Sequence, residues 1–397
     1  MSATPGGARM QGLDALRGFA LFGLFLVHMP ELFELYWLFP ATDPLQLAVH
    51  DAVFTVFGGK AFALMALCFG VSFFVIMDSA ARRGEDYSGR FVWRLVLLGL
   101  MGLLHGLWYR GDILEVLAVM GLFLLPFHRV RSNRVLLGIA ALFLLQPLML
   151  VQIVAGLAGA EWANRPPAFW DDAINPLYTT GSLLDTVRVN ISEGHAQKWA
   201  FMYGSGRLSQ ILGLSLVGMV LGRSGFFARP QAFVRLRWTG LLACLAAALA
   251  LYWLRGPLSS LVPASQTLVM PRDRASTVLG SLFDLSVTGV LLFGFTALYY
   301  GPAGRWLGLF AAPGRMTLSL YVGQSLVFVP VFYGYGLGLY ASMTQLQAVL
   351  WALPAFAVQM VLAHLWFGHF HYGPLEWIWR AATRLDPAIP FRKRRLA

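Results

Sequence analysis

The sequence predicts an all-α, polytopic membrane helix bundle, and three observations carry that prediction. Hydrophobic residues make up 58% of the 397 residues, whereas charged residues make up only 12%, about half the share of a water-soluble protein. The mean hydropathy is correspondingly high, at +0.64. The third observation is a series of apolar runs close to the length of about 20 residues that crosses a bilayer as a helix. We therefore exclude a soluble enzyme, a disordered chain and a disulfide-rich secreted scaffold.

Ten apolar runs follow one another along the chain. They cover residues 16–36, 62–79, 92–109, 113–127, 135–156, 208–222, 239–254, 277–299, 316–335 and 348–366. We expect about ten membrane-spanning helices in one transmembrane domain over residues 1–397, with the lipid bilayer as their surroundings. An eight-helix arrangement, in which a weak run lies at the interface, stays open.

The connections between the runs predict the orientation. With a cytoplasmic N-terminus and ten crossings, the inner segments hold 21 of the 30 Lys and Arg residues. Basic residues gather on the cytoplasmic side of membrane proteins, so this bias predicts that both termini lie inside. The same bias explains the net charge of +11 without a nucleic-acid partner.

One connection is long. Residues 157–207 form the predicted extracytoplasmic loop, and Trp162, Trp170 and Trp199 within it favour a structured segment at the membrane interface. Residues 208–385 form the C-terminal half of the same domain.

Ionisable residues inside the runs are the first candidates for a functional site, because a charge in the membrane is costly unless it faces the bundle or water. Arg17 and His28 lie eleven residues apart in the first run. On a helix this is three turns plus about 20°, so the two side chains share one face, about 16 Å apart. Arg94 and His105 repeat the spacing in the third run.

Two carboxylates, Asp112 and Glu115, stand at the predicted outer start of the fourth run. Capping of the helix N-terminus by itself explains Asp112. The functional interpretation is that Asp112 or Glu115 orients a histidine and fixes its tautomer. The two interpretations are compatible.

Four further polar residues lie in or beside the runs: Lys60, Asp284, Tyr321 and Gln324. We interpret Lys60, at a helix boundary, as a side chain that extends to the membrane surface. Asp284 lies too deep for that and needs a polar partner. We expect no metal site, because neither a carboxylate cluster nor a thiol cluster accompanies the C-terminal histidines.

Four segments resemble motifs of a known family. They are Leu-Asp-Ala-Leu-Arg-Gly-Phe-Ala-Leu at 13–21, Gly-Leu-Trp-Tyr-Arg-Gly-Asp-Ile-Leu at 106–114, the segment 314–325 beginning Gly-Arg-Met, and 372–380 with Gly-Pro-Leu-Glu-Trp. In this order they resemble the YeiB-like membrane proteins, also called domain of unknown function family 418. The resemblance covers nearly the whole chain and implies a multi-pass protein of a bacterial cytoplasmic membrane.

That family is similar to the transmembrane acyltransferases, which include acyltransferase family 3 and the heparan-glucosaminide acetyltransferase. In acyltransferase family 3, an Arg-x10-His pair in the first helix is associated with activity, and Arg17 and His28 match its spacing. Many YeiB-like proteins carry Asn at the position of His28. If asparagine serves at that position in those relatives, His28 is not the shared catalytic group, and His105 becomes the stronger candidate.

The leading hypothesis is therefore an acyltransferase that uses acyl-CoA, most simply acetyl-CoA. Its acceptor would be a hydroxyl or amine of a small molecule or glycan on the outer side. His28 or His105 would serve as general base or acyl carrier. Cations on the inner face would bind the phosphates of the donor. These candidates are Arg17, Arg82, Arg83, Arg90 and Arg94.

The alternative hypothesis is a secondary transporter of a small molecule. Five runs on either side of the long connection would permit an inverted repeat. However, the sixth run has no counterpart of the Arg17 and His28 pair, and the sequence displays no matching pair of broken helices. The acceptor, the acyl chain and the oligomeric state are not fixed by the sequence.

Overall fold

The computed structural model describes residues 10–38, 40–165, 172–265 and 268–393, and these are helical over most of their length. Each of the ten apolar runs coincides with one helix or with two consecutive helices. In a helix, the interior backbone N–H and C=O groups form hydrogen bonds with one another, which is necessary in lipid because no water is present to bond to them. Within the described residues, the one β-type pairing is an isolated antiparallel bridge between Phe370 and Arg392.

The helices follow one another with short connections. In the first half they are α1 Gln11–His28, α2 Pro44–Val56, α3 Lys60–Ala81, α4 Ser88–Gly106, α5 Leu114–Leu124, α6 Asn133–Leu144, α7 Pro147–Leu157, α8 Glu161–Asn164, α9 Asn175–Thr179, α10 Leu183–Ile191 and α11 Glu193–Gly204. In the second half they are α12 Arg207–Ser224, α13 Val234–Ser260, α14 Met270–Tyr299, α15 Gly304–Leu307, α16 Ala311–Arg315, α17 Thr317–Phe332, α18 Gln345–His369 and α19 Pro374–Arg384.

Four helical segments of the described chain are long and apolar enough to cross a membrane, and the number rises to seven if each bent helix pair counts as one span. The four are Pro44–Ala81, Pro230–Ser260, Met270–Tyr299 and Gln345–His369. The membrane-helix class is thus confirmed. The number ten and the orientation with both termini inside stay predictions.

Three apolar helix pairs of the described chain are bent by more than 40° at a short break. The angles are 43° between α6 and α7, 63° between α11 and α12, and 78° where the segment Gly304–Arg315 meets α17. Gln146 and Gly206, at the first two breaks, have left-handed backbones with φ of 55° and 72°. A Cβ on Gly206 would lie 2.4 Å from the Gln146 side-chain oxygen, so these two breaks touch each other. These broken helices belong to the fifth and sixth apolar runs, which are not equivalent positions of a five-plus-five repeat, so the expectation of no matching broken helices stays a prediction.

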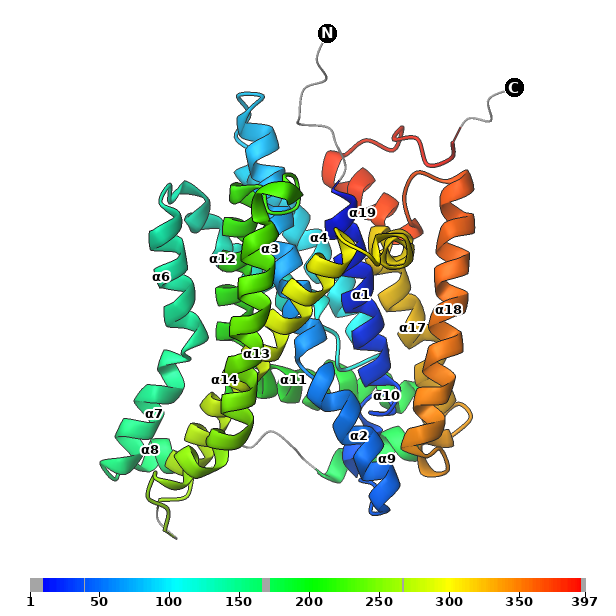
Figure 1. Ribbon diagram of the computed structural model, residues 1–397. Coiled ribbons are helices and arrows are strands. Elements are labelled where there is room, and N and C mark those ends of the chain that lie inside the picture. Colours follow the sequence, from blue (N-terminus) through cyan, green and yellow to red (C-terminus); the bar gives the residue numbers. More distant parts are fainter. Residues whose placement is uncertain (1–9, 39, 166–171, 266–267, 394–397) are drawn as a thin grey trace.

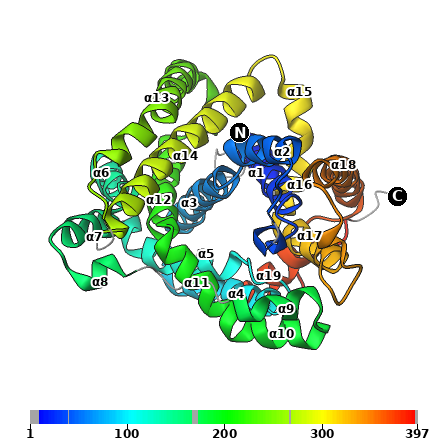
Figure 2. The same cartoon turned by 90° about the horizontal axis from the view of Figure 1, so that it is seen from below.

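The helix that carries Arg17 and His28 is central. In α1, 13 of 18 residues are buried, whereas in α13 only Arg237 and Ala248 are. Figure 2 shows the same contrast, because α13 lies at the edge of the molecule and α1 lies between α3 and α16. A Cβ on Gly314 would lie 1.7 Å from the Asp14 carbonyl oxygen, so only glycine allows α16 to pack this closely on α1.

The two ends of the bundle differ. The described start of α1 and the short helix α19 lie at one end, and α9, α10 and α11 lie at the other (Figure 1). The long connection 157–207 holds the helices α8 to α11, while residues 166–171, with Trp170, lie outside the described residues. Because α11 joins α12 as a bent pair, the helical segment here begins at Glu193 rather than at residue 208.

Candidate functional site

The two predicted histidines meet across a pair of tyrosine rings. His28 is the last residue of α1, and its ring centroid lies 5.7 Å from that of Tyr109 and 6.3 Å from that of Tyr321. His105, near the end of α4, lies 5.9 Å and 5.3 Å from the same two rings. The structure therefore brings together the histidines of two helices at one place in the bundle.

His105 forms the centre of a buried chain of hydrogen bonds. Its Nδ1 lies 2.7 Å from Asp112 Oδ1, and its Nε2 lies 2.5 Å from Ser325 Oγ. The exposed fractions of Asp112, His105 and Ser325 are 0%, 6% and 1%. An ionised carboxylate only accepts hydrogen bonds, so Asp112 places the imidazole proton on Nδ1 and leaves Nε2 as an acceptor. We call these three residues the triad.

The turn between α4 and α5 positions Asp112. Its second carboxylate oxygen accepts a hydrogen bond of 3.2 Å from the Glu115 N–H in the first turn of α5. Gly102 allows this turn to approach α4, since a Cβ there would lie 2.4 Å from the Glu115 nitrogen. Asp112 therefore both caps α5 and contacts His105, which are the two roles that its sequence position suggested.

Helix α17 supplies Ser325 and Tyr321. The indole N–H of Trp108 donates to the Ser325 carbonyl at 3.0 Å, and the Ile113 N–H donates to the Tyr321 hydroxyl at 3.3 Å. Both bonds tie α17 to the segment 106–114. The sequence reasoning missed Ser325, although it is the last residue of the family-like segment 314–325, because a lone serine in an apolar helix has no periodic signal.

Glu115 does not contact either predicted catalytic histidine. It accepts hydrogen bonds from Lys198 Nζ at 2.6 Å and from the Trp199 indole at 3.1 Å, and its Oε1 lies 3.5 Å from His195 Nε2. These partners lie on α11, in the long connection. Of the two carboxylates that could orient a histidine of the site, Asp112 does so, and Glu115 anchors the long connection instead.

The other predicted polar residues join helices elsewhere in the bundle. Lys60 is only 4% exposed, and its Nζ lies 2.6 Å from Asp284 Oδ1, so the interpretation of Lys60 as a surface-reaching side chain was wrong. Helix α14 packs against α3 and supplies Asp284 as the compensating charge. Gln324 donates to Gln359 Oε1 at 2.8 Å and thereby links α17 to α18.

Backbone strain accompanies the site. After α1, Leu32, Phe33 and Glu34 have φ of 49°, 47° and 86°, three consecutive left-handed conformations without a glycine. The turn is held by a 2.6 Å bond from Arg110 Nε to Glu34 and by a 3.3 Å bond from the Tyr333 hydroxyl to the Phe33 carbonyl. Backbone strain of this kind is typical of functional sites. The sequence did not predict it, because the turn contains no glycine that would indicate left-handed backbone.

At the end of the bundle that holds α19, two of the predicted arginines are held by specific partners. Arg17 bonds to Asp14 at 3.2 Å and to the Ser72 hydroxyl. The Arg94 guanidinium lies 3.5 Å from the ring centroid of Trp379 in α19. Arg94 also lies close enough to Arg17, Arg380 and Arg384 for their charges to interact. Arg380 and Arg384 were not among the predicted phosphate ligands.

The remaining predicted arginines lie at the surface, and two of them bind local acids. Arg82 bonds to Asp78 at 2.8 Å and Arg83 to Glu85 at 3.0 Å, with side chains 72% and 53% exposed. Arg90 is exposed and its guanidinium lies 5.9 Å from the Tyr87 ring centroid. The structure does not join these three to the Arg94 group.

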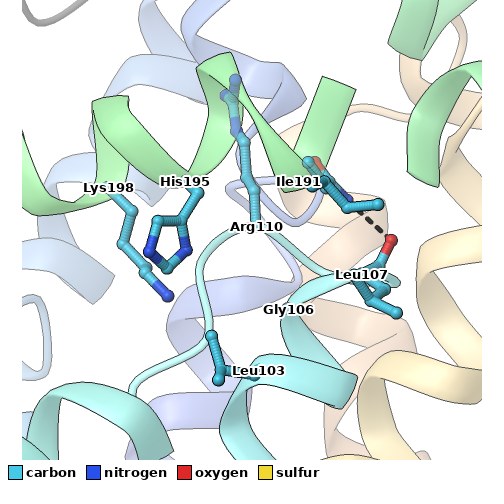
Figure 3. Close-up of a pocket in the computed structure, with 8 residues that line it drawn as sticks. Leu103, Gly106, Leu107, Arg110, Ile191, His195 and Lys198 are labelled. Atoms are coloured by element: carbon cyan, nitrogen blue, oxygen red, sulfur yellow. Dashed lines mark hydrogen bonds between the residues drawn. The ribbon is translucent and has the colours of Figure 1, made fainter. Parts of the chain in front are cut away.

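A pocket of about 150 Å³ lies at the opposite end, between α4 and the helices of the long connection. Its polar lining is Arg110, Asn190, His195 and Lys198. Figure 3 shows Lys198 and His195 side by side. The dashed line in it is the hydrogen bond that the Asn190 side-chain amide donates to the Leu107 carbonyl, at 3.0 Å. Within the described ranges, no three His, Cys, Asp or Glu side chains are grouped to hold a metal ion.

The four family-like segments contact one another in the structure. The segment 13–21 lies in α1, which packs on α16. The segments 106–114 and 314–325 are joined through the triad and the Trp108 indole. Glu376, in the segment 372–380, accepts bonds from the Leu318 and Ser319 N–H groups at 2.8 and 3.1 Å. Burial raises the pKa of Glu376, and these bonds act in the opposite direction.

Comparison with known proteins supports the family resemblance. Residues 221–386 match the model of a family described as "Protein of unknown function (DUF418)". Over 95% of both chains, the protein is 29% identical to the uncharacterized protein YxaH of Bacillus subtilis strain 168. It is 27% identical to the uncharacterized protein YeiB of Escherichia coli K12, over 95% of this chain and 97% of that one. None of these names specifies an activity.

Proposed function

We propose that the protein is a transmembrane acyltransferase of the bacterial cytoplasmic membrane, which moves an acyl group from cytoplasmic acyl-CoA to a hydroxyl or amine acceptor on the outer side. One observation carries this proposal: the buried His105 imidazole, held through Nδ1 by Asp112, directs Nε2 at a hydroxyl group. A carboxylate that fixes the tautomer of an imidazole is the arrangement that a general base requires.

Acyl transfer to a hydroxyl needs a base, because the attacking oxygen loses its proton as the new bond forms. With Asp112 bonded to Nδ1 of His105, Nε2 is the ring atom that can take that proton. His28 supplies a second imidazole beside the same tyrosine rings. In the part of the chain that the structure describes, no hydrogen bond is found to its ring, so it is free to bind a substrate group.

The donor would bind at the end of the bundle that holds α19. Acyl-CoA carries phosphates, for which arginine is a preferred ligand. Arg94 and Arg17, with Arg380 and Arg384 nearby, gather positive charge at this end, and the Trp379 ring holds Arg94 in place. The acceptor would enter from the opposite end, where the polar pocket beside α4 would receive a small hydroxylated group.

Transfer of radiolabelled acetyl groups from acetyl-CoA in membranes that contain the overproduced protein tests the proposal. We expect protein-dependent transfer of label to material outside the CoA pool, and its loss in His105→Ala. His364→Ala is the matched control, because His364 is an exposed histidine of α18 whose Nδ1 lies 2.8 Å from the Met360 carbonyl of its own helix. Equal transfer by all three proteins, or none by the wild type, contradicts the proposal.

One observation favours the alternative, a secondary transporter. The breaks of the α6–α7 and α11–α12 pairs touch at Gln146 and Gly206, where the amides of Gln146 and Gln210 bond to the Ser281 hydroxyl. Broken helices with buried polar groups line the substrate sites of many transporters. Uptake of a solute by proteoliposomes without any acyl donor, lost in Gln210→Leu, would support this function and not the acyltransferase.

A further inference from the structure

We propose that Ser325 is the acyl carrier: it accepts the acyl group from the donor as an ester and passes it to the acceptor. This inference rests on the proposed acyl transfer and names the group that carries it between two half-reactions. It starts from one distance, the 2.5 Å between Ser325 Oγ and His105 Nε2.

The Ser325 hydroxyl has two acceptors and one hydrogen. Its Oγ lies 2.9 Å from the Val322 carbonyl, one turn back in α17, and 2.5 Å from His105 Nε2. The bond to Val322 is the one that serines in membrane helices commonly make and requires no histidine. Rotation of the hydroxyl hydrogen from the Val322 carbonyl to His105 Nε2 aligns it with a base that Asp112 already orients. This is the arrangement of an activated serine nucleophile.

Tyr321 is placed to stabilise the negative charge that develops on the reacting carbonyl oxygen. It precedes Ser325 by four residues, so the two side chains lie on the same face of α17, one turn apart. Its oxygen accepts from the Ile113 N–H, which leaves its own O–H as a donor. A donor held in a dry site favours the transition state because it needs no reorganisation when the charge forms.

The chemistry balances in two half-reactions. In the first, Ser325 Oγ attacks the thioester carbonyl carbon while His105 Nε2 takes the hydroxyl proton; the C–S bond breaks, and the leaving thiolate takes that proton to become free CoA. In the second, the acceptor oxygen or nitrogen attacks the ester carbonyl and gives its proton to His105. The bond between the acyl carbon and Ser325 Oγ then breaks, and the proton returns to the serine.

The position of Ser325 explains why a carrier is useful. The residue lies eight positions into α17, about 12 Å along the helix from the end that Glu376 holds. It is 1% exposed, so little water reaches an ester formed there. A donor arriving from one end and an acceptor arriving from the other can then react in turn, and the bundle never holds both substrates at once.

The test is a reaction without acceptor. Purified protein in nanodiscs is incubated with radiolabelled acetyl-CoA, quenched in acid, digested and mapped by mass spectrometry. We expect one acetyl group on the peptide with Ser325 in the wild type, and none in Ser325→Ala or His105→Ala. Ser286→Ala should be labelled like the wild type. It is the matched control, because Ser286 also bonds to its own helix, donating 2.9 Å to the Leu282 carbonyl.

Ser325→Cys separates loss of chemistry from loss of folding. A cysteine keeps the nucleophile, so we expect this variant to trap acetyl as a thioester that neutral hydroxylamine cleaves rapidly, unlike the serine ester. Unlabelled Ser325→Cys overturns the inference.

The failures of the inference and of the proposed function are distinct. If Ser325→Ala transfers acetyl groups to membrane acceptors at the wild-type rate, or if the label maps to a histidine, serine is not the carrier but acyl transfer stands. If the wild type neither becomes labelled nor transfers acetyl from acetyl-CoA, both proposals fall.

Discussion

Two regions of the molecule hold charged side chains in opposite ways. In the turn between α3 and α4, Arg82 binds Asp78, four residues away, and Arg83 binds Glu85, two residues away. All four side chains are at least partly exposed to solvent. In the bundle, His105, Arg110 and Glu115 are buried, and their partners Ser325, Glu34 and Lys198 lie 220, 76 and 83 residues away.

The difference separates charges that pair locally at the surface from charges that join distant parts of the bundle. Exposed pairs within one turn form wherever opposite charges are neighbours and contribute little to stability. A buried polar group must instead offset its own desolvation, which requires partners delivered by the tertiary fold. The long-range contacts therefore mark the place where function is to be sought, and the following experiments would break or sharpen that distinction.

The largest effect is expected from His105→Ala. Removal of a general base lowers a rate by about 10²–10⁴-fold. We expect a fall of this size in the rate of acetyl transfer at saturating acetyl-CoA, with the protein still folded in detergent. A rate equal to that of the His364→Ala control would show that the buried chain of hydrogen bonds is only structural.

Asp112→Asn is expected to act next most strongly, by about 10²-fold on the same rate, because it disturbs the base without removing it. The amide can still cap α5 through the Glu115 N–H, but it can also donate to His105 Nδ1 and so move the imidazole proton to Nε2. The melting temperature should change little. Asp112→Ala removes the cap as well and should cost about 1 kcal/mol more in stability.

The Glu115 and Lys198 pair should affect stability. Breaking a buried ion pair by removing one partner typically costs about 3–5 kcal/mol, because the other charge stays buried without compensation. We expect Glu115→Gln and Lys198→Met each to lower the free energy of unfolding by such an amount. The double variant should recover most of the loss in an unfolding titration. Additive losses would mean that the two side chains do not interact.

The fold was more predictable than the site, for a physical reason. Ten apolar runs became helices because lipid forces any spanning backbone to satisfy its own hydrogen bonds, and hydropathy alone reports this. The bends at Gln146 and Gly206 bring two distant helices into contact, and their local signals in the sequence are only Pro147 and Gly206 itself.

Within the site, His105 and Asp112 could be found because ionisable groups stand out in apolar sequence. Ser325 could not be found, because what distinguishes it from other serines is its contact with the His105 imidazole, 220 residues away in the sequence. Lys60 was misjudged for the same reason. Whether an ammonium group extends to the surface or pairs with a carboxylate depends on where α14 lies, and neither hydropathy nor spacing reports that.

The smallest effect is expected where the comparison began. The double variant Arg82→Gln, Arg83→Gln should leave the KM for acetyl-CoA unchanged, because both arginines already bind local acids at the surface. Arg94→Gln should raise that KM about tenfold or more, since loss of one charged hydrogen bond costs about 1.5–3 kcal/mol. Kinetics of the two variants decide the matter. A larger rise in the KM of the double variant than in that of Arg94→Gln would place the donor phosphates at the exposed turn and contradict the distinction between the two regions.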